Sequence, residues 1–392
     1  MIKSRFSSDY IFPLLSVFVV SFVLSLFLLQ LIGGVIFFLW LFEKWDEKKK
    51  TLDILTFTIF IFGSVRLLSI FFSAFPSESY EALYKEALFY VAFVFMCFYL
   101  KTLDKKTLLI LVLIFIIGAT TMSIVGITRF VFGNVDRAQG FSSSYTVFSS
   151  YLMAALGLAL FFPRGIQNNK SLFYWSIIIL ILFIGILSSL GRTNILISVL
   201  LIITAVVLKR INWKQVLLLT ALFAGLSTLY FYSSEKQMES KVENRIENFT
   251  QLSDRDIIWK GAKEIFFEKP IIGFGPRTFE RIFPFWDQFA DKKIGGWHND
   301  FLQIYFESGL LGLFSFVGLL IVSLIVSIKQ IRNKKIDADL RGLSTSILVT
   351  LIALILSAIT AGFITSVVLS IVFVFLISIL SRIELDKIKT VN

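Results

Sequence analysis

The stretch TLLILVLIFIIGATTMSIVGIT, residues 107–128, decides the fold class because it contains no charged side chain. A helix of about 20 apolar residues spans the roughly 30 Å hydrocarbon core of a bilayer. Similar runs recur throughout the 392 residues, of which 56% are hydrophobic and 17% charged, and the mean hydropathy is +0.82. The sequence therefore predicts an all-α polytopic membrane protein.

The positive charge is distributed unevenly along the chain. Intervening short loops contain only Lys85, Arg129, Arg137 and Arg192, whereas Lys and Arg concentrate in segments 1–10, 43–52, 101–106, 163–170, 209–214, 328–342 and 382–392. This asymmetry is typical of cytoplasmic loops and places both termini in the cytoplasm. The net charge of +11 thus reports orientation and gives no reason to expect a nucleic-acid partner.

The charge pattern and the apolar runs together predict about twelve transmembrane helices. Nine of them lie in 1–232, an outer loop follows at 233–297, and three more lie in 298–392, all within a single membrane domain. Residues 11–42 are short for two crossings: Gln30, Gly33 and Gly34 favour a tight turn, but one long tilted helix is the alternative. The expected spans are 11–25, 28–42, 53–73, 86–100, 107–128, 144–162, 172–190, 193–208, 215–232, 299–327, 344–361 and 364–381.

The outer loop has the patterns of a folded segment. Met238, Val242, Ile246 and Phe249 have the spacing of an amphipathic helix. A second helix is expected to begin at Ser253 and to end before Pro270. A turn at 273–276 can then direct the backbone toward the membrane, and the aromatic side chains of 279–289 can rest on the interface.

Four residues at the predicted outer boundary suit an anionic ligand and proton transfer. Guanidinium groups bind phosphate oxygens in a bidentate manner, and an imidazole accepts a proton near neutral pH. We expect a phosphate-bearing lipid at the three arginines and deprotonation of a hydroxyl at the histidine, which is the chain's only one. Each also has a structural alternative: His298 can cap a helix, Arg192 can extend to the lipid headgroups, and Arg255 can pair with loop carboxylates. The residues are His298, Arg192, Arg255 and Arg137.

Two charged residues fall well inside predicted spans, away from the span ends. Arg66 lies in span 53–73 and Glu307 in span 299–327. A charge within the membrane is costly unless it faces a cavity or a partner, which makes a supporting role in function the first hypothesis. Glu307-Ser-Gly309 also allows close approach between helices.

Metal and cofactor chemistry find little support in the sequence. One histidine and one cysteine cannot form the usual metal-ligand sets, and the pairs Asp254/Asp256 and Asp337/Asp339 have a spacing that arises often by chance. No phosphate-binding loop, dinucleotide fingerprint or serine elbow is present. We therefore expect neither a metal nor a cofactor.

The boundary residues belong to a longer pattern. His298-Asn-Asp-Phe-Leu302 followed by Glu307-Ser-Gly-Leu-Leu-Gly312 resembles the signature of the bacterial O-antigen ligase and O-antigen polymerase family. Upstream, Arg255-Asp-Ile-Ile-Trp259, the segment 269–276 and Ser189-Leu-Gly-Arg192 are similar to the family's outer-loop and arginine elements. Arg137-Ala-Gln-Gly140-Phe141 is a looser match.

The resemblance implies a glycosyltransferase of the C type in the bacterial inner membrane, with its active site facing the periplasm and 233–297 as the catalytic loop. Such enzymes transfer a glycan from an undecaprenyl diphosphate carrier to an acceptor hydroxyl, inverting the anomeric centre without a metal. By this resemblance Arg192 and Arg255 bind the diphosphate, with Arg137 as a third contact. His298 acts as the base or at least orients the acceptor hydroxyl, and Asn299, which completes the histidine-asparagine pair, supports it.

The sequence leaves the acceptor and two rival functions open. One rival is a non-catalytic scaffold of a polysaccharide export complex, in which His298 would be replaceable. A ligase transfers the glycan to lipid A core, whereas a polymerase extends the growing glycan. A transporter or flippase of lipid-linked oligosaccharide could also bind a diphosphate with arginines, but it requires access from both leaflets. The candidate residues cluster on the outer side, which favours the enzyme.

Overall fold

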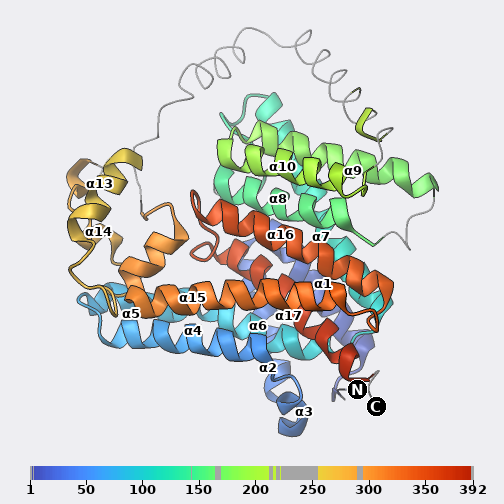
Figure 1. Cartoon of the computed structure of the whole chain (residues 1–392), viewed down its shortest axis with the longest axis horizontal. Helices are drawn as coiled ribbons and strands as arrows, with labels where there is room; N and C mark the ends of the chain where they lie inside the picture. The colour runs from blue at the N-terminus through green and yellow to red at the C-terminus, as the bar shows by residue number, and fades with distance from the viewer. Residues whose placement is uncertain are drawn as a thin grey trace.

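The computed structural model describes residues 2, 4–142, 144–163, 169–211, 215–217, 221, 255–288 and 295–389, and all regular elements among these residues are helical (Figure 1). The first half contains α1 (Ser8–Leu24), α2 (Leu26–Leu41), α3 (Trp45–Lys49), α4 (Ile54–Phe71), α5 (Pro76–Lys85), α6 (Ala87–Leu100), α7 (Lys105–Val131), α8 (Tyr145–Phe161), α9 (Asn169–Ser188) and α10 (Arg192–Val207). The second half contains α13 (Arg255–Ile265), α14 (Phe279–Ile282), the 3-10 turn η2 (Trp286–Gln288), α15 (Asp300–Arg332), α16 (Ala338–Ala358) and α17 (Val367–Lys389).

The predicted spans overlap these helices. Eleven of the twelve coincide with α1, α2, α4, α6 to α10 and α15 to α17, whereas most of span 215–232 lies outside the described residues. Six helical stretches within the described chain are long and apolar enough to cross a membrane, and five shorter apolar helices accompany them. The protein is a polytopic helical membrane protein, and the number of about twelve crossings stays a prediction.

Residues 11–42 form two helices and not one. The backbone is extended at Ser25, which ends α1 and precedes α2. The turn therefore does not lie at Gln30, Gly33 or Gly34, as their composition suggested, because all three are inside α2. A Cβ on Gly33 would lie 3.1 Å from the Phe18 ring, so this glycine allows α1 and α2 to pack closely.

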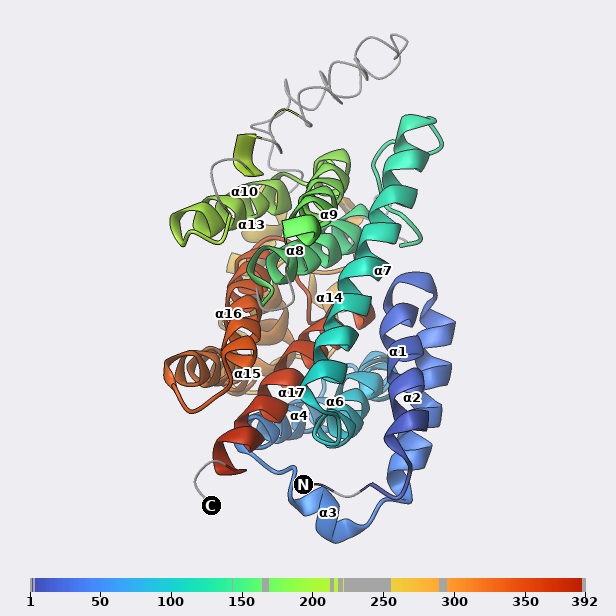
Figure 2. The same cartoon turned by 90° about the vertical axis from the view of Figure 1, so that its right-hand side faces the viewer.

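Two helices occupy the interior of the molecule. Every residue of α8 from Phe148 to Phe161 is buried, and α8 packs against α7, α9, α10 and α16 (Figures 1 and 2). The second interior helix, α17, is buried from Leu369 to Ile383 and packs mainly on α6. Their surroundings are other helices, and exposed apolar side chains such as Phe57 and Phe60 are left to contact lipid.

The long helix α15 is broken at Gly309, whose backbone is non-helical (φ 62°, ψ −162°). The chain segment 270–275 replaces the lost helical hydrogen bonds. The carbonyls of Phe306 and Glu307 accept from the amides of Phe274 and Gly275 (2.8 and 3.0 Å), while the amides of Leu310 and Leu311 donate to the carbonyls of Pro270 and Ile271 (2.7 and 3.3 Å). Backbone polar groups must be satisfied within a membrane, so this segment belongs to the structure of α15.

Residues 255–288 belong to the predicted outer loop and are called the outer segment. They pack on the first turns of α15. The predicted helix after Ser253 is present as α13, although Ser253 itself and the predicted helix at 238–249 lie outside the described residues. The predicted return toward the membrane at 273–276 is the segment that repairs α15. Apolar side chains of α13, α14, α15 and the segments that connect them form one buried cluster: Ile258, Ala262, Ile265, Phe274, Phe279, Phe283, Trp297, Tyr305 and Phe306.

Candidate active site

His298 stands immediately before α15 but does not cap it. The N-cap is Asn299, whose Oδ1 accepts from the amides of Phe301 and Leu302 (2.9 and 3.1 Å). His298 has a φ of 50°, in the left-handed region that non-glycine residues seldom adopt. Such backbone strain persists where surrounding structure enforces it, often at functional sites. The supporting residue Asn299 thus has a defined structural role, which is to start the helix directly after His298.

The His298 side chain lines a cavity of about 720 Å³ and is accessible within it. Protein atoms around the imidazole still displace part of its water. This desolvation lowers the pKa of His298 from its ordinary value of 6.5, and the positive charge of Arg255 lowers it further. The imidazole is therefore held as the neutral base at neutral pH.

Arg255 opens α13 and faces the same region. Its Nη2 donates to the carbonyl of Thr360 (2.9 Å), in the connection between α16 and α17. Burial lowers the pKa of Arg255, and the neighbouring guanidinium of Arg192 lowers it further. Arg255 therefore lies close enough to interact electrostatically with both Arg192 and His298, which are distant from it in sequence.

Arg192 is the first residue of α10 and follows a tight turn. Leu190 has a φ of 54°, and Gly191 is the N-cap. Arg137 secures this turn because its guanidinium donates to the carbonyls of Ser189 (3.2 Å) and Leu190 (2.8 Å). It also stacks over the Tyr145 ring, 3.4 Å from the centroid. Arg137 positions the turn that presents Arg192, and phosphate binding by Arg137 stays a prediction.

A buried polar contact fixes the start of α10. The side-chain amide of Asn194 donates to the hydroxyls of Ser149 (2.7 Å) and Ser150 (3.0 Å) on α8. Its side-chain oxygen Oδ1 accepts from the hydroxyl of Ser357 (3.0 Å) on α16. Buried amides without partners are costly, so this geometry favours one register of the three helices. It holds the first turn of α10, which begins at Arg192, against α8 and α16.

Asp300 is a residue that sequence reasoning missed. Its carboxylate is 1% exposed and accepts from the amides of Phe363 (2.6 Å) and Ile364 (3.1 Å). The loop after α16 is thereby tied to the start of α15, and the same loop provides the carbonyl that binds Arg255. The only sequence signal was an acid directly after the His298-Asn299 pair.

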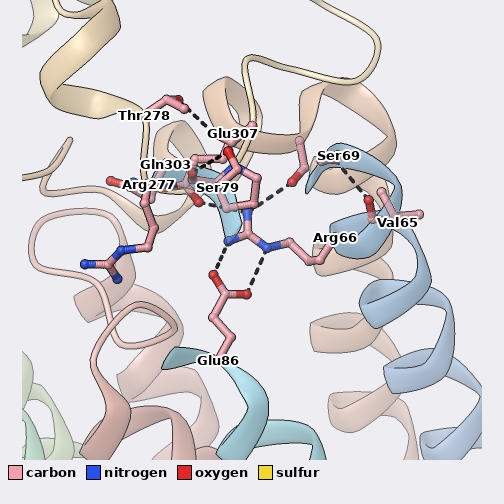
Figure 3. A network of polar contacts seen from close by, with 12 residues as sticks. Val65, Arg66, Ser69, Ser79, Glu86, Arg277, Thr278, Gln303 and Glu307 are labelled. Atoms are coloured by element: carbon pink, nitrogen blue, oxygen red, sulfur yellow. Dashed lines mark hydrogen bonds and ion pairs between the residues drawn. The ribbon is translucent and has the colours of Figure 1, made fainter. Parts of the chain in front are cut away.

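Arg66 and Glu307 contact each other, as Figure 3 shows. Arg66 Nη1 lies 2.8 Å from the Glu307 carboxylate and donates to the Ser308 hydroxyl (3.0 Å), and its guanidinium also pairs with Glu86. Glu307 in turn accepts from the backbone amide of Arg277 (2.8 Å). This cluster connects α4, α6 and α15 with the outer segment. Glu86 was not singled out in the sequence because it lies at a predicted span end, where acids are common.

The cavity beside His298 has walls from segments distant in sequence. Asn299, Asp300, Gln303 and Glu307 line it from α15, and Arg192, Arg255 and Arg137 are not among its lining residues. The other charged residues and the tyrosines of its walls were not predicted as site residues, because they lie on α5, α6 and α14, at the junction of α5 with α6, and in the turn before α14. Those residues are Tyr84, Lys85, Glu86, Tyr90, Arg277 and Glu280.

Of the two acidic pairs considered for metal binding, only Asp337/Asp339 lies wholly within the described residues. Asp254 lies outside the described residues. Asp337 caps α16, and both Asp337 and Asp339 bind Lys105 (3.0 and 3.1 Å). Among the residues that the structure describes, no group of three or more His, Cys, Asp or Glu side chains is arranged to hold a metal ion. Independence from metal stays a prediction.

The region around these residues matches a known protein family. Residues 176–317 match the family described as O-antigen ligase. The matched range includes Arg192, Arg255, His298, Asn299 and Glu307. A search of curated proteins finds none that matches this chain.

Proposed function

Because this chain belongs to the O-antigen ligase and polymerase family, whose members transfer glycans at membranes, we propose that it transfers a glycan from undecaprenyl diphosphate to an acceptor hydroxyl. The acceptor is lipid A core in a ligase or a carrier-linked glycan in a polymerase. The observation that carries the proposal is that Arg255 lies near enough to interact with both Arg192 and His298, and that His298 lines a cavity large enough for a substrate.

In the proposed mechanism the two arginines bind the diphosphate. Arg255 and Arg192 repel each other and are partly desolvated, so a dianionic group between them relieves an unfavourable arrangement. Positive charge at this position also stabilises the diphosphate as its bond to the glycan breaks. Their guanidinium groups provide this stabilisation without requiring a cation.

His298 is the proposed base. The acceptor oxygen attacks the anomeric carbon from the face opposite the diphosphate, the carbon–diphosphate bond breaks, and the hydroxyl proton passes to the imidazole. This displacement inverts the anomeric centre. The lowered pKa of His298 supports the role because the imidazole is neutral when the acceptor arrives.

The proposed location follows from the charge pattern. With both termini cytoplasmic, the loop 233–297 and His298 face the periplasmic side of the inner membrane, where carrier-linked glycans are used. Helices of 1–232 and 298–392 then form one membrane domain around this catalytic loop.

Reconstitution of the purified protein with undecaprenyl diphosphate glycan tests the function. Lipid A core and carrier-linked glycan are offered as acceptors, and products are identified by mass. Transfer to core identifies a ligase, and lengthening of the carrier-linked chain identifies a polymerase. Movement of the lipid-linked glycan between leaflets without either product would support the transporter alternative and contradict the enzyme.

Two variants test the residue roles in that assay. His298→Ala is expected to abolish transfer while the protein folds normally. Arg255→Lys is expected to lose most activity if two guanidinium nitrogens bind the diphosphate, since lysine cannot make this bidentate contact. Full activity of Arg255→Lys would reduce its role to charge alone, and near-normal activity of His298→Ala would contradict the base. Addition of EDTA is expected to leave the rate unchanged.

A further inference from the structure

The cavity beside His298 has the size of a small-molecule site. Its volume of about 720 Å³ lies within the roughly 300–1,000 Å³ typical of ligand pockets. Its walls come from α2, α4, α5, α6, α8, α14, α15 and α17, from the turn before α14, and from the loop between α16 and α17. The diphosphate-binding arginines Arg192 and Arg255 do not line it. The cavity is therefore available to a second substrate that meets His298.

The lining combines aromatic surfaces with hydrogen-bonding groups. Tyr84, Tyr90 and Phe279 contribute rings, and the Tyr84 side chain is 65% exposed. Asn299, Gln303 and several carboxylates contribute polar atoms. A sugar presents apolar ring faces and many hydroxyl donors, so it matches this mixture better than a lipid tail or a fully polar ion does.

The charge of the walls narrows the class of sugar. Lys85 and Arg277 both pair with the carboxylate of Glu81. The lining residues Glu86 and Glu307 both pair with Arg66, which does not itself line the cavity. Glu280 and Asp300 add two further acids to the lining. Carboxylates thus outnumber basic side chains around the cavity. A carboxylate brought into this space would face repulsion and loss of hydration.

We propose that this cavity is the acceptor-sugar subsite and that it takes a neutral or amino sugar while excluding a uronic acid. The proposal rests on the proposed transfer function, because His298 then receives the proton of the bound sugar's hydroxyl. Tyr84 provides the exposed ring face, and Glu280 provides the rim carboxylate that discriminates by charge.

Chemical modification of the single histidine tests the subsite without any donor. The full chain, purified with a histidine-free tag and placed in lipid nanodiscs, is treated with diethyl pyrocarbonate. The rate of modification of His298 is read from peptide masses. Methyl glucoside, methyl glucosaminide and methyl glucuronide are compared as protecting agents at equal concentration. We expect several-fold slower modification with the first two and no protection by the glucuronide.

Matched variants locate the effect in the cavity. Tyr84→Ala is expected to remove protection by the neutral sugar, whereas Tyr80→Ala, one turn earlier on α5 and not in the lining, retains it. Glu280→Gln is expected to allow partial protection by the glucuronide. Glu264→Gln, an exposed acid on α13 outside the cavity, is expected to leave the discrimination unchanged.

The outcomes separate this proposal from the proposed function. Equal protection by the glucuronide, or none by any sugar, overturns the subsite even if the same preparation transfers glycan. Sugar protection with the expected charge preference, in a preparation that transfers nothing to either acceptor, supports the subsite and contradicts the transfer function. Protection that survives Tyr84→Ala places the sugar elsewhere and overturns the assignment.

Discussion

Two effects that the local sequence does not reveal lower the pKa of His298. The surrounding protein removes water from the imidazole, and Arg255 adds a positive charge nearby. Both effects disfavour the protonated form, so the folded-state pKa lies below that of the unfolded chain. The stability contributed by the neutral imidazole is present above about pH 6.5 and is lost as pH falls through the folded-state pKa.

A titration of His298 by NMR measures this shift directly, because a chain with one labelled histidine gives one signal. The midpoint is expected below 6.5, and the acid limb of the transfer rate is expected to follow it. Arg255→Gln should raise the midpoint by removing a like charge. Arg281→Gln, an exposed residue on α14, is the control and should not change it. A wild-type midpoint at or above 6.5 would contradict the electrostatic account.

The ion pair between Arg66 and Glu307 is a second feature at the residue scale. Both side chains are almost inaccessible to solvent, at 4% and 3% exposure. Removal of one partner from a buried pair costs about 3–5 kcal/mol because the remaining charge is uncompensated. When Glu307 is the residue replaced, Arg66 still pairs with Glu86, which reduces this cost.

Glu307→Gln is therefore expected to lower the unfolding temperature clearly and to loosen the turn at Arg277, whose amide binds Glu307. Thermal unfolding of the purified protein in detergent measures the first effect. Glu280→Gln alters an exposed carboxylate of the same region and is expected to change stability by no more than about 0.5 kcal/mol. Equal unfolding temperatures for the two variants would show that the buried pair adds nothing to stability.

Helix α15 shows how an element depends on chain that is distant in sequence. Its sequence has the pattern of a continuous apolar helix, and it was predicted as one span, 299–327. The break at Gly309 arises because amides and carbonyls of the segment 270–275 replace helical hydrogen-bond partners within α15. The sequence Glu307-Ser-Gly309 was expected to allow two helices to approach closely. The closest neighbour of Gly309 is instead the backbone of Ile271 and Ile272, which is not helical.

Gly309→Ala tests this arrangement. A Cβ at Gly309 would overlap the Ile271 carbonyl, and its backbone conformation alone costs a non-glycine residue about 1–3 kcal/mol. The variant is expected to be less stable and to lose transfer, since the outer segment and the start of α15 shift together. Gly318→Ala in the same helix meets no atom within 4 Å and is expected to be neutral or slightly stabilising. Similar behaviour of the two variants would contradict the role of the break.

At the scale of the whole molecule, orientation determines whether the site meets its substrates. Cys97 is the only cysteine and is buried, so Cys97→Ser gives a background for single-cysteine labelling. Glu264→Cys is expected to react with an impermeant maleimide on spheroplasts, whereas Lys49→Cys and Lys335→Cys, all three positions being exposed, should react only after permeabilisation. Labelling of all three on the same side would refute the predicted topology.

Composition and hydropathy identify the class of this protein, and the residues proposed for its chemistry come from a local sequence pattern. Apolar runs long enough for a bilayer and a one-sided distribution of Lys and Arg are properties of composition, so they can be read without tertiary structure. His298, Arg192 and Arg255 were identifiable because they form part of a family pattern. The helix α13 was likewise predicted from local spacing and the proline that follows it.

The contacts between these groups depend on packing that the sequence pattern does not specify. The pairing of Arg66 with Glu307, the loop that binds Asp300, the repair of α15 and the cavity walls all join residues far apart in sequence. Such contacts depend on which helices become neighbours, and helical periodicity specifies a face without specifying its partner. Tyr84 and Glu280 therefore looked like ordinary surface residues until the packing of α5 and the outer segment brought them to the cavity beside His298.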